Sequence, residues 1–336
     1  MLQQKMNEKL SIDNFNMNSY SICEITNVNN KNEIQFFLCS KTNLFLINID
    51  LSNLQMNILE KNLDNMYCNE CIEVKKENYI IIGGNGVYHL SGMPSQIIKN
   101  DDKNKNVNIF KLFSGKYYIG GIKINENIIA LSSNCIYSTG EDKLLFFNLN
   151  KRKITHEIEG FSFIGALNGL SLININIKKK EKESLDKILL CACKKYTFNQ
   201  KNGILLVELN LNDNEKIYYE FYETDFEVHC FCQIDEIIDE KINIIDKKIS
   251  VKNTKYFLVG GFKTNKGGII YLYECIYDEE SCHSKINSLL EVDFEDLEGL
   301  KSINCIIQSK ETGDILISCR DGKDYSFKFF GKEIFK

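Results

Sequence analysis

Cysteine is a residue type in this chain that can bind a metal or act as a nucleophile. There are thirteen cysteines, and Cys68 and Cys71 form a C-x-x-C pair, which is half of a common zinc site. A second pair would be needed to complete it. Judged by residue type alone, the candidates for this second pair are Cys191/Cys193, Cys230/Cys232 and Cys282-His283. Because residues three apart on a strand point to opposite faces, we interpret the cysteines as small, reduced, buried residues and expect no bound zinc.

The histidines do not indicate a nucleophilic active site. His89, His156, His229 and His283 lie outside any GxSxG or HExxH motif. We interpret His89 and His156 as strand residues that face solvent. We therefore expect no catalytic residue.

Two glycine-rich segments could bind phosphate, and one acidic run could bind a cation or a basic partner. Gly83-Gly84-Asn85-Gly86 and Gly260-Gly261 follow apolar runs, but no Lys-Ser/Thr pair and no helix follows to bind phosphate. We interpret these glycines as tight turns. The acidic run 291–298 could bind a cation or a basic partner, and we favour a solvated connection. The sequence thus predicts no cofactor.

Composition narrows the class of protein. The 336-residue chain has a net charge of −5, which argues against a general nucleic-acid binder. It has neither the apolar leader of a secreted protein nor a run of about 18 apolar residues that would insert into a membrane. An odd number of cysteines in a chain of this length suits reduced thiols. We expect a cytoplasmic protein.

The elements that must position these residues are short strands that repeat. An apolar run ends in two small residues six times, at intervals of 44 to 68 residues. The runs end at Leu38-Cys39-Ser40, Ile82-Gly83-Gly84, Leu131-Ser132-Ser133, Cys191-Ala192-Cys193, Val259-Gly260-Gly261 and Ile317-Ser318-Cys319. Small residues here would let neighbouring sheets approach near a central axis.

Each small pair is flanked by further strand-like runs. Inner strands are predicted upstream at 21–25, 70–74, 118–124, 166–172, 228–234 and 303–308, and third strands downstream at 44–49, 87–90, 144–148, 204–209, 269–273 and 325–330. Fourth strands are predicted at 54–59, 96–99, 153–158, 216–222 and 286–292. Segments 178–187 and about 235–253 are predicted to be solvated insertions.

The third and last units carry the motif closest to a known family. The last unit contains Ile317-Ser318-Cys319-Arg320-Asp321-Gly322, and the third unit has Leu131-Ser132-Ser133 followed by Glu141-Asp142. They resemble degenerate WD40 repeats, in which an Asp after the second strand accepts hydrogen bonds that tie the unit together. Asp142 and Asp321 match that position. The other units lack it, and the family's Trp-Asp and Gly-His pairs are absent.

The resemblance implies an all-β, closed β-propeller. We expect six four-stranded blades, with seven as the alternative if another blade lies around residues 99–112. Residues 1–336 would form a single propeller domain. Residues 5–12 would supply the missing strand of the last blade.

A propeller without an assembled active site suggests a non-catalytic scaffold that binds protein partners. The alternatives are a six-bladed hydrolase or lyase with a site in the central channel, and a structural subunit of a cytoskeletal or trafficking assembly. The turns between second and third strands are rich in basic residues, and we predict that this face binds acidic protein segments. The predicted partner-binding residues are Lys41, Lys194, Lys195, Lys263, Lys266, Arg320 and Lys323.

Overall fold

The computed structural model describes most of the chain. The described residues are 19–25, 33–40, 42–50, 52, 55–63, 68–83, 86–99, 108–113, 118–133, 143–159, 166–179, 182–195, 199–209, 218–234, 254–278, 281–292, 302–308, 315–321 and 324–330. Within them, no helix is long and apolar enough to cross a membrane.

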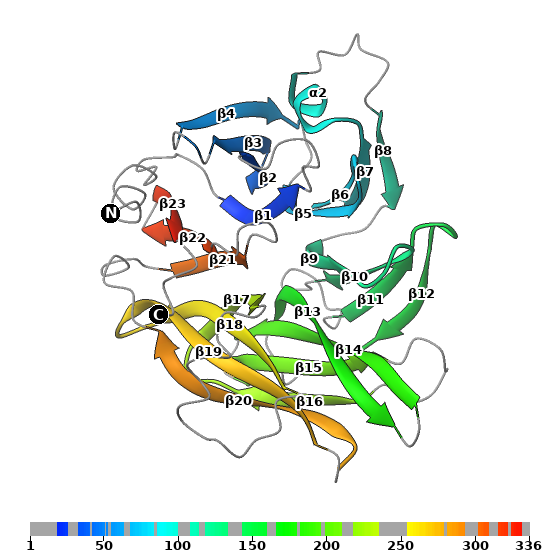
Figure 1. Cartoon of the computed structure of the whole chain (residues 1–336), viewed down its shortest axis with the longest axis vertical. Coiled ribbons are helices and arrows are strands. Elements are labelled where there is room, and N and C mark those ends of the chain that lie inside the picture. The colour runs from blue at the N-terminus through cyan, green and yellow to red at the C-terminus, as the bar shows by residue number, and fades with distance from the viewer. Residues whose placement is uncertain are drawn as a thin grey trace.

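Antiparallel sheets surround a common centre, and in each sheet the strands follow one another outward in chain order (Figure 1). The first two blades are β1 (Ser19–Ile25), β2 (Glu33–Ser40), β3 (Asn43–Asp50) and β4 (Gln55–Asn62), then β5 (Cys68–Lys75), β6 (Asn78–Gly83), β7 (Gly86–Ser91) and β8 (Asn108–Phe113). The third comprises β9 (Tyr118–Lys123), β10 (Ile128–Ser133), β11 (Lys143–Asn148) and β12 (Lys153–Ile158).

The second half of the chain continues the same order. The fourth blade comprises β13 (Ala166–Lys179), β14 (Lys182–Lys194), β15 (Gly203–Leu209) and β16 (Tyr219–Glu223). The fifth comprises β17 (Glu227–Ile234), β18 (Thr254–Lys263), β19 (Gly267–Asp278) and β20 (His283–Val292). A three-stranded sheet of β21 (Ser302–Gln308), β22 (Ile315–Asp321) and β23 (Asp324–Phe330) completes the series.

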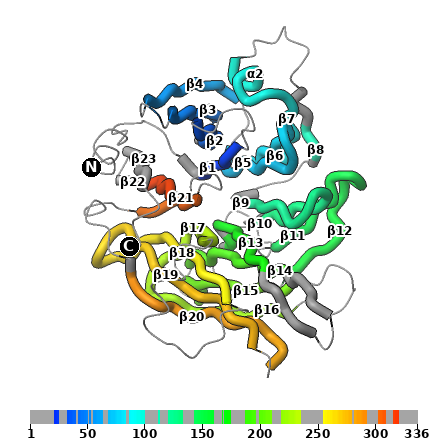
Figure 2. Tube along the Cα trace, in the orientation of Figure 1, coloured from blue at the N-terminus to red at the C-terminus, as the bar shows by residue number. Residues whose placement is uncertain are grey.

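The core lies between neighbouring sheets. Each inner strand contacts the next, from β1 through β5, β9, β13 and β17 to β21, and β21 contacts β1 again. Figure 2 shows this ring as a colour sequence in which the red end of the chain lies beside the blue end. Apolar clusters fill the spaces between sheets; one of them joins Ile22, Phe36 and Leu316 across the junction of the last and first sheets. The predicted all-β propeller is confirmed.

The predicted blade count is wrong, as is the seven-blade alternative. Among the described residues five sheets have four strands, and the remaining sheet, β21 to β23, has three. The segment considered for a seventh blade instead holds β8, which pairs with β7 as the outer strand of the second blade. Residues 5–12, predicted to supply the missing strand, lie outside the described residues.

Two further segments differ from expectation. The predicted fourth strand at 96–99 is the helix α2 (Pro94–Lys99), which begins with proline at a position where the missing N–H costs nothing and buries Ile97 and Ile98. The charged segment 178–187 is not a loop, because β13 and β14 pair as a hairpin to Lys179 and Lys182. Residues 235–253 lie outside the described part of the chain.

Every inner strand contains a bulge at the same place. One extra residue interrupts the pairing with the second strand at Tyr20, Asn69, Ile119, His229 and Asn304, and in β13 two residues, Asn168 and Gly169, lie opposite one. The bulges lie opposite the small pairs that the sequence repeats. A bulge bends its strand and redirects side chains, so the small pairs mark where the inner strand departs from regular pairing.

The glycines Gly260 and Gly261 show why small residues are needed at these positions. Contrary to the predicted turn, both lie within β18. A Cβ atom on Gly261 would lie 1.9 Å from the carbonyl oxygen of Glu227, and one on Gly260 would lie 2.7 Å from Cγ2 of Ile303 in the next sheet. Close approach of backbones, and not a turn, fixes glycine here.

The bulge at Asn69 also corrects the interpretation of the C-x-x-C pair. With one residue bulged out, Cys68 and Cys71 no longer alternate, and both are buried on the same side of β5. The inference that they face opposite sides is therefore wrong, because it assumed a regular strand.

Candidate functional site

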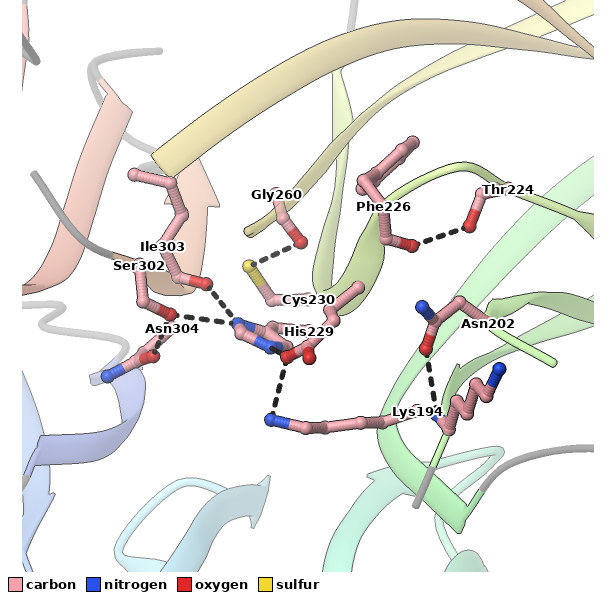
Figure 3. Close-up of polar contacts among 12 residues, drawn as sticks. Lys194, Asn202, Thr224, Phe226, His229, Cys230, Gly260, Ser302, Ile303 and Asn304 are labelled. Carbon is pink, nitrogen blue, oxygen red and sulfur yellow. Dashed lines mark hydrogen bonds and ion pairs between the residues drawn. The ribbon is translucent and has the colours of Figure 1, made fainter. Parts of the chain in front are cut away.

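His229 is the extra residue in the bulge of β17, and it lies among polar groups from neighbouring inner strands (Figure 3). Its Nδ1 atom is 3.0 Å from the carbonyl oxygen of Ile303 and 3.1 Å from Oγ of Ser302, both in β21. Its Nε2 atom is 3.4 Å from a carboxylate oxygen of Glu227. The ring thus bridges the fifth blade and the three-stranded sheet.

Glu227 extends this set of contacts into the fourth blade. The Nζ atom of Lys194, at the end of β14, is 2.8 Å from Oε2 of Glu227. The hydrogen bond from His229 and the charge of Lys194 outweigh partial burial and lower the pKa of Glu227 to about 2. Glu227 is therefore ionised at neutral pH. We call Lys194, Glu227, His229, Ser302 and Asn304 the rim cluster.

A glycine lets the inner strands approach at this point. A Cβ atom on Gly169 of β13 would lie 2.3 Å from the carbonyl oxygen of His229. The backbones of β13 and β17 can meet this closely only without a side chain at residue 169. Gly169 therefore fixes the position of the β17 bulge against the fourth blade.

The rim cluster has the residue types of a Ser-His-Glu catalytic triad, but its hydrogen bonds run the wrong way. A carbonyl oxygen can only accept, so Nδ1 of His229 carries the proton that it donates to Ile303. A protonated Nδ1 cannot accept the Ser302 hydroxyl proton, as a general base must. Ser302 instead donates to Oδ1 of Asn304, at 3.1 Å. The chemistry of the cluster is that of a polar link between blades.

The structure brings two of the predicted partner-binding lysines to this region. Lys194 joins the rim cluster, and Lys263 forms an ion pair of 2.5 Å with Asp225, two residues before Glu227. Lys195 is exposed beside Lys194, and Lys266 lies farther out, paired with Glu291 at 2.9 Å.

The remaining members of the predicted set are only partly described. The backbone of Arg320 lies in β22, while Lys41 and Lys323 are outside the described residues. Their role in partner binding stays a prediction.

Sequence reasoning missed the carboxylates that accompany the turn lysines. At the start of a third strand, Lys201 pairs with Glu223 at the end of the fourth at 2.5 Å, and Lys143 pairs with Glu157 in the same way. Lys266 and Glu291 repeat the arrangement. Charges counted in the turns alone overstate the basic character of this face, because the acids come from strand ends about 14 to 25 residues later. A carboxylate near the end of each of these fourth strands was the signal available in the sequence.

The other histidines contact structural groups. His283 stacks on Tyr218 with ring centroids 3.6 Å apart, and its Nδ1 atom is 3.0 Å from Oε2 of Glu208. His156 is 3.2 Å from Oγ1 of Thr155. His89 and His156 are both partly buried, contrary to the solvent-facing expectation, and burial lowers the pKa of His89.

The acidic run is described only at its first two residues, where Glu291 pairs with Lys266 and accepts a hydrogen bond from Tyr271 at 3.0 Å. In the described part of the chain, no three Cys, His, Asp or Glu side chains form a group that could hold a metal ion.

The chain is similar to solved structures over most of its length. A luciferin-regenerating enzyme superposes with a TM-score of 0.55 at 8% identity, covering 96% of this chain and 95% of its own. The fold is a β-propeller.

Two proteins described as propellers align less well. They are the Dos1 propeller (TM-score 0.43, 11% identity, 92% of this chain and 68% of that one) and the β-propeller domain of the Trilobed protease from Pyrococcus furiosus (0.38, 8%, 90% and 78%). No family model and no curated protein sequence matches this chain. At such identities the likeness concerns the fold alone.

Proposed function

We propose that this propeller is a non-catalytic platform that binds protein partners through the face formed by the turns between second and third strands. The observation that supports this best is the direction of the hydrogen bonds in the rim cluster. His229 donates to the Ile303 carbonyl, so the histidine nearest a hydroxyl is committed to holding sheets together.

The face itself suits a charged partner. Lys195 is exposed, and Lys266 has a side chain that is 54% exposed despite its ion pair. Surface ion pairs of this kind contribute only about 0–1 kcal/mol, so a partner carboxylate can compete for such a lysine at little cost. The proposed partner is an acidic protein segment, and the proposed location is the cytoplasm.

Charge reversal of exposed lysines tests this proposal. Lys195→Glu with Lys266→Glu should reduce capture of native partners by the tagged full chain several-fold, and should weaken its salt dependence. The matched control is Lys151→Glu with Lys153→Glu, which reverses two exposed lysines at the turn between β11 and β12 on the opposite face. Equal capture by both double variants would contradict the proposed face.

A further inference from the structure

A basic surface patch lies where the second and third blades meet, on the face opposite the turns between second and third strands (Figure 1). Its residues belong to three turns, which join β5 to β6, β9 to β10 and β11 to β12, with the adjoining strand ends. The segments 73–78, 123–127 and 149–153 contain three acidic residues and six basic ones, namely Lys75, Lys76, Lys123, Lys151, Arg152 and Lys153. We call these six residues the basic patch. Its excess of positive charge contrasts with the net charge of −5 of the whole chain.

Backbone and side-chain contacts bring the three turns together. Nζ of Lys123, at the end of β9, donates a hydrogen bond to the carbonyl oxygen of Val74 in β5. The N–H of Leu149 donates to the carbonyl oxygen of Asn127 at 2.8 Å, which joins the second turn to the third. Leu149 and Ile154 also pack against the apolar cluster that contains Val74. The basic patch is therefore one region that extends across two blades.

The charges of the basic patch are less neutralised than those of the opposite face. Lys75, Lys76 and Lys151 are exposed, and within the described part of the chain they form no ion pair. On the opposite face, Lys201 and Lys266 each pair with a glutamate. A negatively charged partner can therefore contact the lysines of the basic patch without first displacing a carboxylate of the protein.

Local backbone geometry keeps a charged side chain in the third turn. Arg152 has a φ of 51°, the left-handed conformation in which glycine or asparagine costs less. Burial, and then the positive charges of Lys75 and Arg152, lower the pKa of His89 in β7. Cations from two blades thus act on one residue, in agreement with the contacts between the turns.

An exposed apolar side chain borders the basic patch. Met93 is 51% exposed, more than any other large apolar side chain in the described part of the chain. The N–H of Gly92 donates to the carbonyl oxygen of Glu77 at 2.9 Å, which holds Met93 beside the turn between β5 and β6. The Met93 carbonyl oxygen accepts hydrogen bonds from the N–H groups of Gln96 and Ile97 at the start of α2. Its backbone is therefore fixed while its side chain faces solvent.

We propose that the basic patch and Met93 bind the surface of a membrane that contains anionic phospholipids. The cations contact the lipid headgroups, and Met93 enters the boundary between headgroups and acyl chains. A membrane surface buries an exposed methionine beside cations, whereas an acidic protein segment supplies only the charge, so the combination favours lipid. The protein lies on the membrane, and its described residues include no helix that could cross it. This surface is separate from the proposed protein-binding face and does not depend on it.

Sedimentation with vesicles tests the proposal. The full-length protein is mixed with vesicles of phosphatidylcholine and phosphatidylserine, or of phosphatidylcholine alone, and centrifuged. We expect the protein to sediment with the phosphatidylserine vesicles only, and to be released as the salt concentration rises, because salt screens the attraction. No sedimentation, or equal sedimentation with both kinds of vesicle, would overturn the proposal.

Variants locate the binding surface. Lys75→Glu with Lys76→Glu should weaken binding to phosphatidylserine vesicles at least tenfold. The matched control, Lys195→Glu with Lys266→Glu, makes the same change in net charge on the opposite face and should leave vesicle binding unchanged. Equal losses in both double variants would overturn the proposal, because net charge alone would then explain binding.

Two further measurements separate lipid from an acidic protein segment. Met93→Ser should weaken vesicle binding several-fold at every salt concentration, since it removes an apolar contact that salt does not screen. Unchanged binding would remove Met93 from the proposed surface. Binding of labelled polyglutamate through Lys75 and Lys76, by a protein that does not sediment with vesicles, would overturn the proposal in favour of an acidic protein partner.

Discussion

At several positions in this protein, the close approach of neighbouring strands or sheets requires glycine, and the residue has no chemical role of its own. Gly169, Gly260 and Gly261 each lie where a methyl group would collide with a neighbouring strand or sheet. The sequence revealed Gly260 and Gly261 as one of the recurring small pairs, but it could not distinguish a turn from a tight contact. That distinction depends on the neighbouring strand, which one sequence window does not contain.

Gly261→Ala tests this reading. The added Cβ would lie 1.9 Å from the Glu227 carbonyl oxygen, so β17 or β18 must shift. We expect a loss of about 1–3 kcal/mol in the free energy of unfolding, as for other overpacked sites, measured by urea denaturation. Thr264→Ala, in the exposed turn that follows β18, serves as the control and should change little. A neutral Gly261→Ala would contradict the close contact.

Glu227 gives a pH dependence whose direction follows from its environment. Its folded pKa of about 2 is below the usual value, so the unfolded chain binds the proton more readily. The stabilisation is therefore present above about pH 4.5 and lost as the pH falls toward 2. Because solvent screens the partly exposed Glu227 carboxylate, its ionisation stabilises the folded chain by about 1–2 kcal/mol.

Glu227→Gln should remove that contribution. The difference in unfolding free energy between the native chain and the variant should shrink between pH 5 and pH 2, measured by denaturant titration at each pH. Glu223→Gln, an exposed glutamate of the same blade junction, is the control. A difference that stays constant across this range would contradict the assigned ionisation of Glu227.

The positions of the strands were largely predictable from the sequence, but the short helix and the bulges in the inner strands were not. Apolar runs located every inner, second and third strand, because strand periodicity is a local property. The helix α2 was missed because four residues ending in Lys99 are too few to reveal a period. The bulges were missed because an extra residue is defined only by its pairing partner. As a result the sequence could not indicate the rim cluster.

Some lysine side chains reach from one blade to the next, and removing such a contact should lower stability. Nζ of Lys187 in β14 donates to the backbone carbonyl of Ile124, which follows β9 in the preceding blade. Lys187→Met keeps the apolar stem but leaves this carbonyl without its charged donor. We expect a loss of about 1–2 kcal/mol in unfolding free energy. Lys151→Met, at an exposed turn, should be neutral, and an equal effect of both would contradict a link between blades.

For the whole molecule, the contact of β21 with β1 makes the ring continuous, but the sheet at that junction has three strands in the described chain. The prediction that residues 5–12 supply a further strand stays open to a direct test. Deleting residues 1–13 should lower the melting temperature by about 5 °C or more, since an outer strand and its packing would be lost. Deleting residues 331–336 is the control. An unchanged melting temperature after the first deletion would count against closure by this segment.

The position of the proton on His229 separates most directly a structural link between blades from a catalytic relay. With only four histidines, nitrogen-15 labelling of the imidazole rings resolves each one by NMR, and His229→Gln assigns the signal. We predict that Nδ1 of His229 is protonated at neutral pH, as its 3.0 Å contact with the Ile303 carbonyl requires. An unprotonated Nδ1 that accepts a hydrogen bond from Ser302 would contradict the account and favour an enzyme.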